Sequence, residues 1–352
     1  MADNSFLHRR WKLILNLATI VALLVLVYAI RHQLSQTFHN FAHINAWALL
    51  LIIPIEILNY DSQARLYRSL FQIVGNKLPY RGLFETSLEL NFINHVFPSG
   101  GVTGISYFGV RMRNSEITTA KATVVQLLKL VLLILSFEIV LVLGLLFLAI
   151  GGHANNLTIL VAASLTTLIL VITAGSAFII GSKRRIAGFF TYVTRQLNRI
   201  IHVVRPNYPE TINTARVRTL FEDLHDNYQM VQNNWRALKM PFVWALMANV
   251  WEVAAVYIVY IAFGQFVNVG AIILAYAVAN FAGLVSVLPG GIGVYEAIMT
   301  TVLVAAGVPA RLSLPVTVMY RVVNTLVQLP PGYYFYHRTL HGTKEPIQSE
   351  GK

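Results

Sequence analysis

The sequence predicts an all-α polytopic membrane protein with six full spans, two re-entrant helical hairpins and cytoplasmic termini. Of its 352 residues, 56% are hydrophobic and only 12% are charged, which is about half the charged share of an average soluble domain. The apolar residues form blocks close to the roughly 20 residues that a spanning helix needs. Lysine and arginine collect between these blocks, and their distribution selects one topology.

The first apolar block, Leu13–Ile30, follows the basic stretch His8–Lys12 and so resembles a secretory signal peptide. No cleavage site of small residues precedes Arg31, and we therefore expect this block to be retained as the first helix. A polar insert lies at 182–240. Further apolar segments lie at 44–60, 83–97, 102–110, 122–150, 157–181, 241–263, 271–288, 294–307 and 312–336.

Three of these segments are too short to cross a bilayer alone. At about 1.5 Å per residue, 83–97 reaches roughly 22 Å, 102–110 roughly 14 Å and 294–307 roughly 21 Å, against a hydrocarbon core of about 30 Å. All three flank proline-glycine breaks, at Pro98–Gly101 and Pro289–Gly293. Each break therefore belongs either to one interrupted span or to a hairpin that returns to the side it entered from.

The basic residues distinguish these two topologies. With two hairpins and a cytoplasmic N-terminus, 23 of the 27 Lys and Arg residues lie inside, and only Arg31 and Arg311 lie outside. This is the bias that the positive-inside rule expects. With two interrupted spans, the insert 182–240 and its ten Lys and Arg residues would lie outside. The hairpin topology is therefore preferred.

The hairpin topology makes the chain an inverted repeat. Each half runs span, span, hairpin, span, and 13–150 starts inside whereas 157–336 starts outside. Many secondary transporters have this architecture, with the site at the repeat interface near the bilayer midplane. We predict one membrane domain, 1–338, followed by a polar tail, 339–352. The insert 182–240 is interpreted either as a basic amphipathic helix on the inner leaflet or as a solvated linker helix.

The two breaks form the first candidate binding site. Proline removes a backbone donor and glycine frees φ, so the chain should stop one half-helix and turn within the membrane. A following half-helix offers free N–H groups and a positive dipole end to an anion such as a phosphate headgroup. The alternative is that the glycines only permit close helix packing. The candidate residues are Pro98, Gly100, Gly101, Gly104, Pro289, Gly290, Gly291 and Gly293.

Ionisable residues inside apolar segments are the second signal, because a charge at the bilayer centre costs at least about 2.5–3.5 kcal/mol. Glu296 lies on the first turn after the second break and is predicted to pair with Arg321 of the last span. Arg111 is interpreted as a headgroup contact at the inner interface or as a positive-inside anchor. Secondary binding candidates are Glu89, Asn91, Asn94 and Asn280. Structural roles are expected for Glu56, Lys129, Glu138 and Glu252.

The composition excludes several classes of function. The chain has no cysteine, which removes disulfides, thiolate metal sites and cysteine nucleophiles. Its net charge of +12 comes from segments that flank apolar blocks, so the matching partner is an anionic lipid surface and not a nucleic acid. No zinc-protease, serine-hydrolase, P-loop or dinucleotide motif is found. We therefore predict no catalytic residue, no metal and no cofactor.

The motifs Pro289–Glu296, Tyr320–Arg321 and Phe97–Gly104, together with Pro330, resemble the transmembrane region of the lysylphosphatidylglycerol synthase family, the multiple peptide resistance factor. The resemblance covers most of the chain. It implies a membrane fold with re-entrant helices. It also implies a flippase that moves aminoacylated phosphatidylglycerol between leaflets.

Two departures limit what the resemblance implies. Only a short polar tail follows Arg338, without the aminoacyl transferase domain of the family, so synthase activity is not expected. Many relatives also carry an arginine soon after the first glycine pair, where this chain has Ile105–Tyr107 and reaches Arg111 only later. The identity of the headgroup therefore stays open, and glycolipid or polyprenyl-phosphate cargo remains an alternative because several relatives are attached to glycosyltransferases.

The leading hypothesis is a lipid translocase of the plasma membrane, and not an enzyme. A phospholipid or glycolipid headgroup, anionic, zwitterionic or aminoacylated, would pass through a cavity between the two hairpins. A lipid-synthesising enzyme or a glycosyltransferase is a possible partner. The alternatives are a membrane-embedded lipid-modifying transferase and a non-catalytic partner of a glycosyltransferase.

Overall fold

The computed structural model describes residues 44–97, 102–113, 115, 117–152, 156–180, 235–285 and 293–341, with Val21, Tyr28, Ser182, Arg185 and Gly188. All regular secondary structure among these residues is helical. Most of the first predicted span, Pro98–Gly101 and Pro289–Ile292 of the two breaks, and most of the insert 182–240 lie outside the described residues. The predictions for those segments stay untested.

The helices follow the predicted apolar segments closely. Their bounds are α2 Ala46–Leu49, α3 Ile52–Ile73, α4 Tyr80–Val96, α5 Val102–Arg113, α6 Thr119–Ile150, α7 Asn156–Ile180, the 3₁₀ helix η1 Trp235–Leu238, α10 Lys239–Ala262, α11 Val269–Val285, α12 Val294–Ala305 and α13 Ala310–His341. Two described stretches, Lys121–Ile150 and Arg236–Ala262, are long and apolar enough to cross a bilayer by length and composition.

The main difference from the predicted segments concerns 44–60. A turn at Leu50 and Leu51 separates the short α2 from α3, and α3 continues to Ile73. The second half of α3 is amphipathic, because Arg65 lies on the outside while Tyr67 is fully buried. The predicted apolar segment stops at residue 60 because polar residues on one face begin there, although the helix itself continues.

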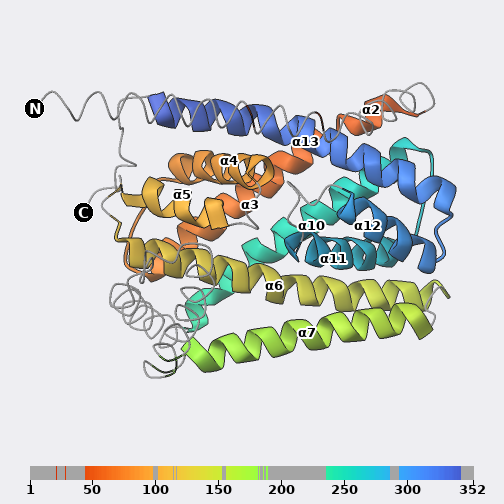
Figure 1. Ribbon diagram of the computed structural model, residues 1–352, viewed down its shortest axis with the longest axis horizontal. Coiled ribbons are helices and arrows are strands. Elements are labelled where there is room, and N and C mark those ends of the chain that lie inside the picture. Colours follow the sequence, from red (N-terminus) through yellow and green to blue (C-terminus); the bar gives the residue numbers. More distant parts are fainter. Residues whose placement is uncertain are drawn as a thin grey trace, which may run out of the picture.

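Two short helix pairs lie at opposite ends of the long axis of the molecule (Figure 1). The first pair, α4 with α5, occupies the left half of the view, and the second pair, α11 with α12, occupies the right half. The members of each pair pack against each other. The long helices α6 and α13 run along the whole molecule and contact both pairs.

The contacts between the two halves are reciprocal. Helix α4 packs against α13, which follows the second pair, and α11 packs against α6, which follows the first pair. Glycine permits the close approach in both places. A Cβ added at Gly332 of α13 would lie 2.7 Å from Phe92 Cβ of α4. A Cβ added at Gly270 of α11 would overlap the carbonyl oxygen of Gly144 of α6.

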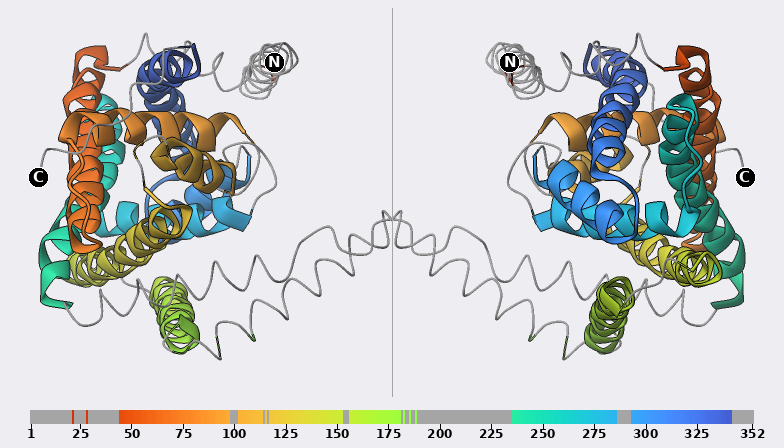
Figure 2. Two further views of the ribbon diagram at one scale, coloured as in Figure 1. Left: turned by 90° about the vertical axis from the view of Figure 1, so that its left-hand side faces the viewer. Right: turned by 90° about the vertical axis from the view of Figure 1, so that its right-hand side faces the viewer.

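Helices α3 and α10 lie side by side along one edge of the bundle, whereas α7 lies outside α6 (Figure 2). The buried apolar residues form two main clusters. The larger joins α10, α11, α12 and α13, and the smaller joins α3, α4, α5 and the first half of α6. The described candidate residues lie on the helices that these clusters hold together.

Candidate functional site

Glu296 and Arg321 lie together, as predicted from the sequence. Arg321 Nε is 3.5 Å from Glu296 Oε1, and the Glu296 side chain is only 5% exposed. Gly293 precedes α12 with φ of 84°, and its N–H donates a 2.6 Å hydrogen bond to Glu296 Oε2. Glycine adopts this left-handed φ at little cost. The N–H group at the beginning of α12 is thus already bound to a carboxylate of the chain itself. Arg321 is therefore better suited than this helix end to bind an added anion.

Tyr295 adds an unsatisfied polar group to this pair. Its hydroxyl is buried and has no hydrogen-bond partner among the described residues, whereas buried hydroxyls usually have one. The Arg321 guanidinium lies 4.6 Å from the centre of the Tyr295 ring. Arg321 also interacts electrostatically with His95, near the end of α4. One arginine on α13 therefore pairs with α12 and lies within electrostatic range of α4.

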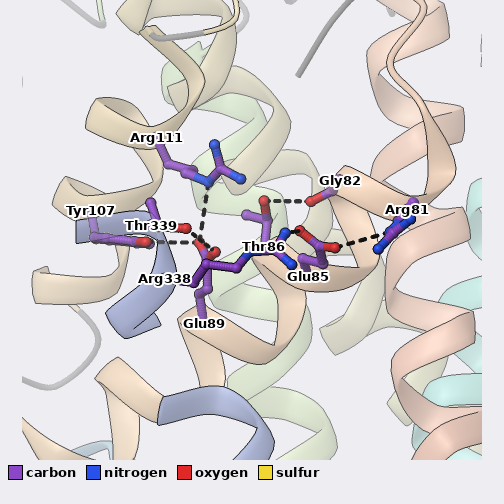
Figure 3. A network of polar contacts seen from close by, with 9 residues as sticks. All are labelled: Arg81, Gly82, Glu85, Thr86, Glu89, Tyr107, Arg111, Arg338 and Thr339. Carbon is purple, nitrogen blue, oxygen red and sulfur yellow. Dashed lines mark hydrogen bonds and ion pairs between the residues drawn. The ribbon is translucent and has the colours of Figure 1, made fainter. Parts of the chain in front are cut away.

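Glu89 forms a second buried ion pair, with Arg111 (Figure 3). Arg111 Nε lies 3.2 Å from Glu89 Oε2, and the Tyr107 hydroxyl donates to the same oxygen over 2.7 Å. The Thr339 hydroxyl donates to Glu89 Oε1 over 2.6 Å. Glu89 is fully buried. Arg111 thus has an intramolecular acid partner on α4, which the sequence interpretation did not identify.

Glu85, one turn before Glu89, adds to the contact between α4 and α13. Arg338 Nη2 lies 2.7 Å from Glu85 Oε2, and Arg81 Nε lies 3.2 Å from Glu85 Oε1 (Figure 3). Together with Thr339, Arg338 fastens the last turns of α13 to α4. This cluster ties the first short pair to α13.

The other predicted candidates have local contacts. Gly104 is buried, and a Cβ added there would overlap Asn94 Oδ1, so this glycine allows α5 to approach α4 closely. Asn280 donates from Nδ2 to the Tyr276 carbonyl of its own helix over 3.0 Å. Candidates whose positions lie outside the described residues stay predictions: Pro98, Gly100, Gly101, Pro289, Gly290 and Gly291.

A buried polar network crosses the middle of the protein, and its first half runs from α6 to α10. Lys129 Nζ donates to Gln63 Oε1 over 2.9 Å. Gln63 Nε2 donates to Asn59 Oδ1 over 2.8 Å, and Asn59 Nδ2 donates to Glu252 Oε1 over 2.6 Å. Two oriented amides therefore connect a buried ammonium group to a carboxylate.

The second half of this central network runs along α13 to α3. Tyr320 donates from its hydroxyl to Glu252 Oε2 over 3.3 Å and accepts from Asn324 Nδ2 over 3.3 Å. Gln328 Nε2 donates to Asn324 Oδ1 over 3.0 Å and to Glu56 Oε2 over 2.8 Å. A single polar connection thus joins Lys129, Glu252 and Glu56, which the sequence interpretation treated as separate structural residues.

Asn91 brings α4 into the central network. Its Nδ2 donates to Gln328 Oε1 over 2.7 Å and also to the Tyr60 hydroxyl. The sequence contains a signal for this network, because Tyr320, Asn324 and Gln328 recur at every fourth position of the last span. Polar residues with this spacing share one helix face, and such a face is expected to be buried against other polar groups.

Comparison with known proteins places the chain among membrane proteins. The family described as "Lysylphosphatidylglycerol synthase TM region" matches residues 13–332. A UPF0104 membrane protein of Methanothermobacter thermautotrophicus is 31% identical over 97 residues, which are 28% of this chain and 29% of the relative. A UPF0104 membrane protein of Methanocaldococcus jannaschii is 22% identical over 293 residues, which are 81% of this chain and 82% of the relative. The family expected from the sequence motifs is thereby confirmed.

Proposed function

We propose that this chain, which belongs to the lysylphosphatidylglycerol synthase TM region family, is a translocase that moves a phospholipid or related lipid between the two leaflets of a membrane. The observation that carries the proposal is the buried ion pair of Glu296 and Arg321, which joins α12 to α13. A buried ion pair is costly to bring into a membrane and is therefore typical of a functional site.

The chemistry of this site suits a headgroup with both charges. Arg321 offers a planar group of donors to a phosphate, and Glu296 offers a carboxylate to an amine. The buried Tyr295 hydroxyl offers a hydrogen bond to a ligand oxygen. The phosphate replaces Glu296 as the neighbour of Arg321, and the amine replaces Arg321 as the neighbour of Glu296. A zwitterionic or aminoacylated phospholipid satisfies both groups at once.

The proposed topology is an inverted repeat with α4–α5 and α11–α12 as re-entrant hairpins. The reciprocal packing of α4 on α13 and of α11 on α6 supports it, because a two-fold pseudosymmetry generates such paired contacts. Residues 1–338 form one multi-pass domain of six full spans in the plasma membrane, with the termini and the insert 182–240 in the cytoplasm. Movement of one repeat against the other exposes the site to each leaflet in turn.

Flux of fluorescent lipid in proteoliposomes tests this function. The probes are phosphatidylethanolamine and phosphatidylglycerol labelled on one acyl chain, and leaflet position is measured by chemical quenching from outside. Glu296→Gln and Arg321→Gln are expected to slow the flux about tenfold or more, because hydrogen bonds to charged groups contribute about 1.5–3 kcal/mol.

The matched control is Arg113→Ala, which removes an exposed arginine at the end of α5. It is expected to leave flux at the wild-type rate. Size-exclusion chromatography of each variant establishes that the protein is folded and monodisperse. Wild-type flux in both Glu296→Gln and Arg321→Gln would overturn the proposed site, and absence of flux in the wild-type protein with either probe would contradict translocation of these lipids.

A further inference from the structure

The central network contains more negative than positive charge. Its carboxylates are Glu56 and Glu252, and its ammonium group is Lys129. Among the described residues, the ion pairs engage Asp61, Glu85, Glu89 and Glu296, and none of them includes Glu56 or Glu252. With every group ionised, one negative charge is left without compensation. Such a charge inside a membrane protein is strongly disfavoured.

Glu56 has the one carboxylate oxygen in this network that lacks a hydrogen bond. Its Oε2 accepts from Gln328, whereas its Oε1 is buried without a hydrogen-bond partner in the part of the chain that the structure describes. Glu56 is only 2% exposed, so this oxygen does not face bulk solvent. Both oxygens of Glu252 accept hydrogen bonds, from Asn59 and from Tyr320. A network with one uncompensated negative charge therefore also contains one carboxylate oxygen, Glu56 Oε1, that lacks a hydrogen bond.

The neighbouring polar groups favour a proton over a metal ion at this atom. Gln328 directs an N–H group to Glu56, and Asn59 directs an N–H group to Glu252. A metal ion needs several oxygen atoms with free lone pairs, and three of the four carboxylate oxygens of this network already accept hydrogen bonds. A proton needs only one oxygen. It also removes the uncompensated charge.

We infer that Glu56 is a proton-binding site and that its protonation is coupled to lipid movement. The coupling rests on the proposed translocase function, whereas the proton site itself does not. In the cycle, Glu56 Oε1 takes a proton from water on one side of the membrane and forms a neutral carboxyl group. The O–H bond breaks and the proton leaves to water on the other side when the carboxylate is exposed there.

Several titratable groups surround Glu56. Tyr60 lies one turn along α3, and Glu252 on α10 and Tyr320 on α13 are within electrostatic range of Glu56. Helix α6 contributes Lys129 through the amides, and α4 contributes the uncharged Asn91 through Gln328. The negative charge of Glu252 acts directly on Glu56, whereas Lys129 acts through intervening groups.

Helix α13 connects the proton site to the lipid site. Gln328, which bonds Glu56, lies seven positions after Arg321, which pairs with Glu296. Seven positions are about two helical turns, so both side chains lie on nearly the same face of α13. Gln328 also holds Asn91 of the first short pair. Loss or gain of charge at Glu56 therefore changes contacts of the helix that carries Arg321.

Infrared spectroscopy tests the proton site without transport. The wild-type protein at neutral pH is expected to show the C=O stretching band of a protonated carboxyl group, and Glu56→Gln is expected to lose this band. Glutamine keeps the size of the side chain and an acceptor for Gln328. Glu85→Gln is the control, because Glu85 is paired with Arg338 and should not contribute to the band. A band that is absent from the wild type, or equally strong in Glu56→Gln, would overturn the inference.

Lipid distribution under a pH gradient tests the coupling. In wild-type proteoliposomes, one proton per lipid shifts the leaflet ratio of labelled phosphatidylethanolamine about tenfold per pH unit. Glu56→Gln is expected to lose this shift, and Glu85→Gln is expected to keep it. If the wild-type protein moves lipid but the leaflet ratio does not depend on the pH gradient, the coupling is overturned and the translocase proposal remains intact. A carboxyl band that depends on Glu56, without any flux in the wild type, would support the proton site and contradict translocation.

Discussion

Gln328 on α13 donates a hydrogen bond from Nε2 to Oε2 of Glu56 on α3, over 2.8 Å and across 272 positions of sequence. Both side chains are buried, with 4% and 2% of their surface exposed. The same amide receives a hydrogen bond from Asn91 at its oxygen. One glutamine of α13 therefore joins two consecutive helices, α3 and α4, that lie far from α13 in the sequence.

Replacing Gln328 with leucine is expected to destabilise the protein. The change removes the donor to Glu56 and the acceptor of Asn91, and a buried polar group left unsatisfied costs about 1–3 kcal/mol. Thermal unfolding in detergent micelles, followed by tryptophan fluorescence, measures the effect. Leu326→Ala is the control, because Leu326 is 56% exposed on the same helix. Equal melting temperatures of Gln328→Leu and wild type would contradict the role of this contact.

Close helix packing gives a second prediction, at Gly270 of α11. Any side chain there would overlap the Gly144 carbonyl of α6, and overpacking of this kind costs about 1–3 kcal/mol. We expect Gly270→Val to lower the melting temperature clearly. Gly175→Val is the control, because no described residue lies within 4 Å of a Cβ added at Gly175. If both substitutions have the same effect, the contact between α6 and α11 is looser than described.

The helices were largely predictable from the sequence, because membrane segments can be recognised by their length and hydrophobicity. The predicted segment 122–150 corresponds to α6, Thr119–Ile150, and 271–288 corresponds to α11, Val269–Val285. The second half of α3 was not predicted, because it did not appear as an apolar segment in the sequence. Its buried side chains alternate with Asp61 and Arg65, which form a 2.8 Å ion pair on the outside. Average hydropathy does not detect a helix with two different faces.

The candidate site was only partly predictable, and the reason is the distance along the chain. The pair of Glu296 and Arg321 was predicted, since both are charged residues in apolar segments of one hairpin and the span that follows it. The bond between Glu56 and Gln328 joins opposite ends of the sequence. Its formation depends on how α3 meets α13. Without that packing, each residue resembles an isolated polar group.

The pair of Glu296 and Arg321 gives a third prediction, on stability. Two neighbouring groups in one interaction are expected to be non-additive by about 0.5–3 kcal/mol. The double variant Glu296→Gln/Arg321→Gln should therefore be more stable than the sum of the two single losses indicates, because breaking a buried pair leaves one charge uncompensated. Chemical unfolding in micelles measures the four proteins of this cycle.

The control cycle for that prediction uses Asp61 and Arg65. Their 2.8 Å pair lies on the surface, and the arginine side chain is 48% exposed. Exposed pairs contribute about 0.2–1 kcal/mol, so Asp61→Asn and Arg65→Gln are expected to be almost additive. Additivity in the Glu296 and Arg321 cycle as well would show that the charges of this pair do not depend on each other.

The contacts at the end of α13 give a fourth prediction, on local opening. Arg338 and Thr339 bind Glu85 and Glu89 of α4. Arg338→Gln/Thr339→Val removes two charge-assisted hydrogen bonds, each worth about 1.5–3 kcal/mol. The final turns of α13 are therefore expected to open more often, with amide hydrogen exchange at 333–341 about tenfold faster or more.

Mass-spectrometric hydrogen exchange in nanodiscs measures this opening peptide by peptide. Thr301→Val is the control, because the Thr301 hydroxyl is exposed and bonds the Ala297 carbonyl of its own helix, over 2.7 Å. It should leave exchange at 333–341 unchanged. Exchange in α11 should stay at the wild-type rate in both variants, since the affected contacts lie at the opposite end of the molecule from the second short pair (Figure 1). Unchanged exchange at 333–341 in the double variant would mean that packing of Phe92 against Tyr336, whose ring centres are 5.3 Å apart, holds the end of α13 without these polar contacts.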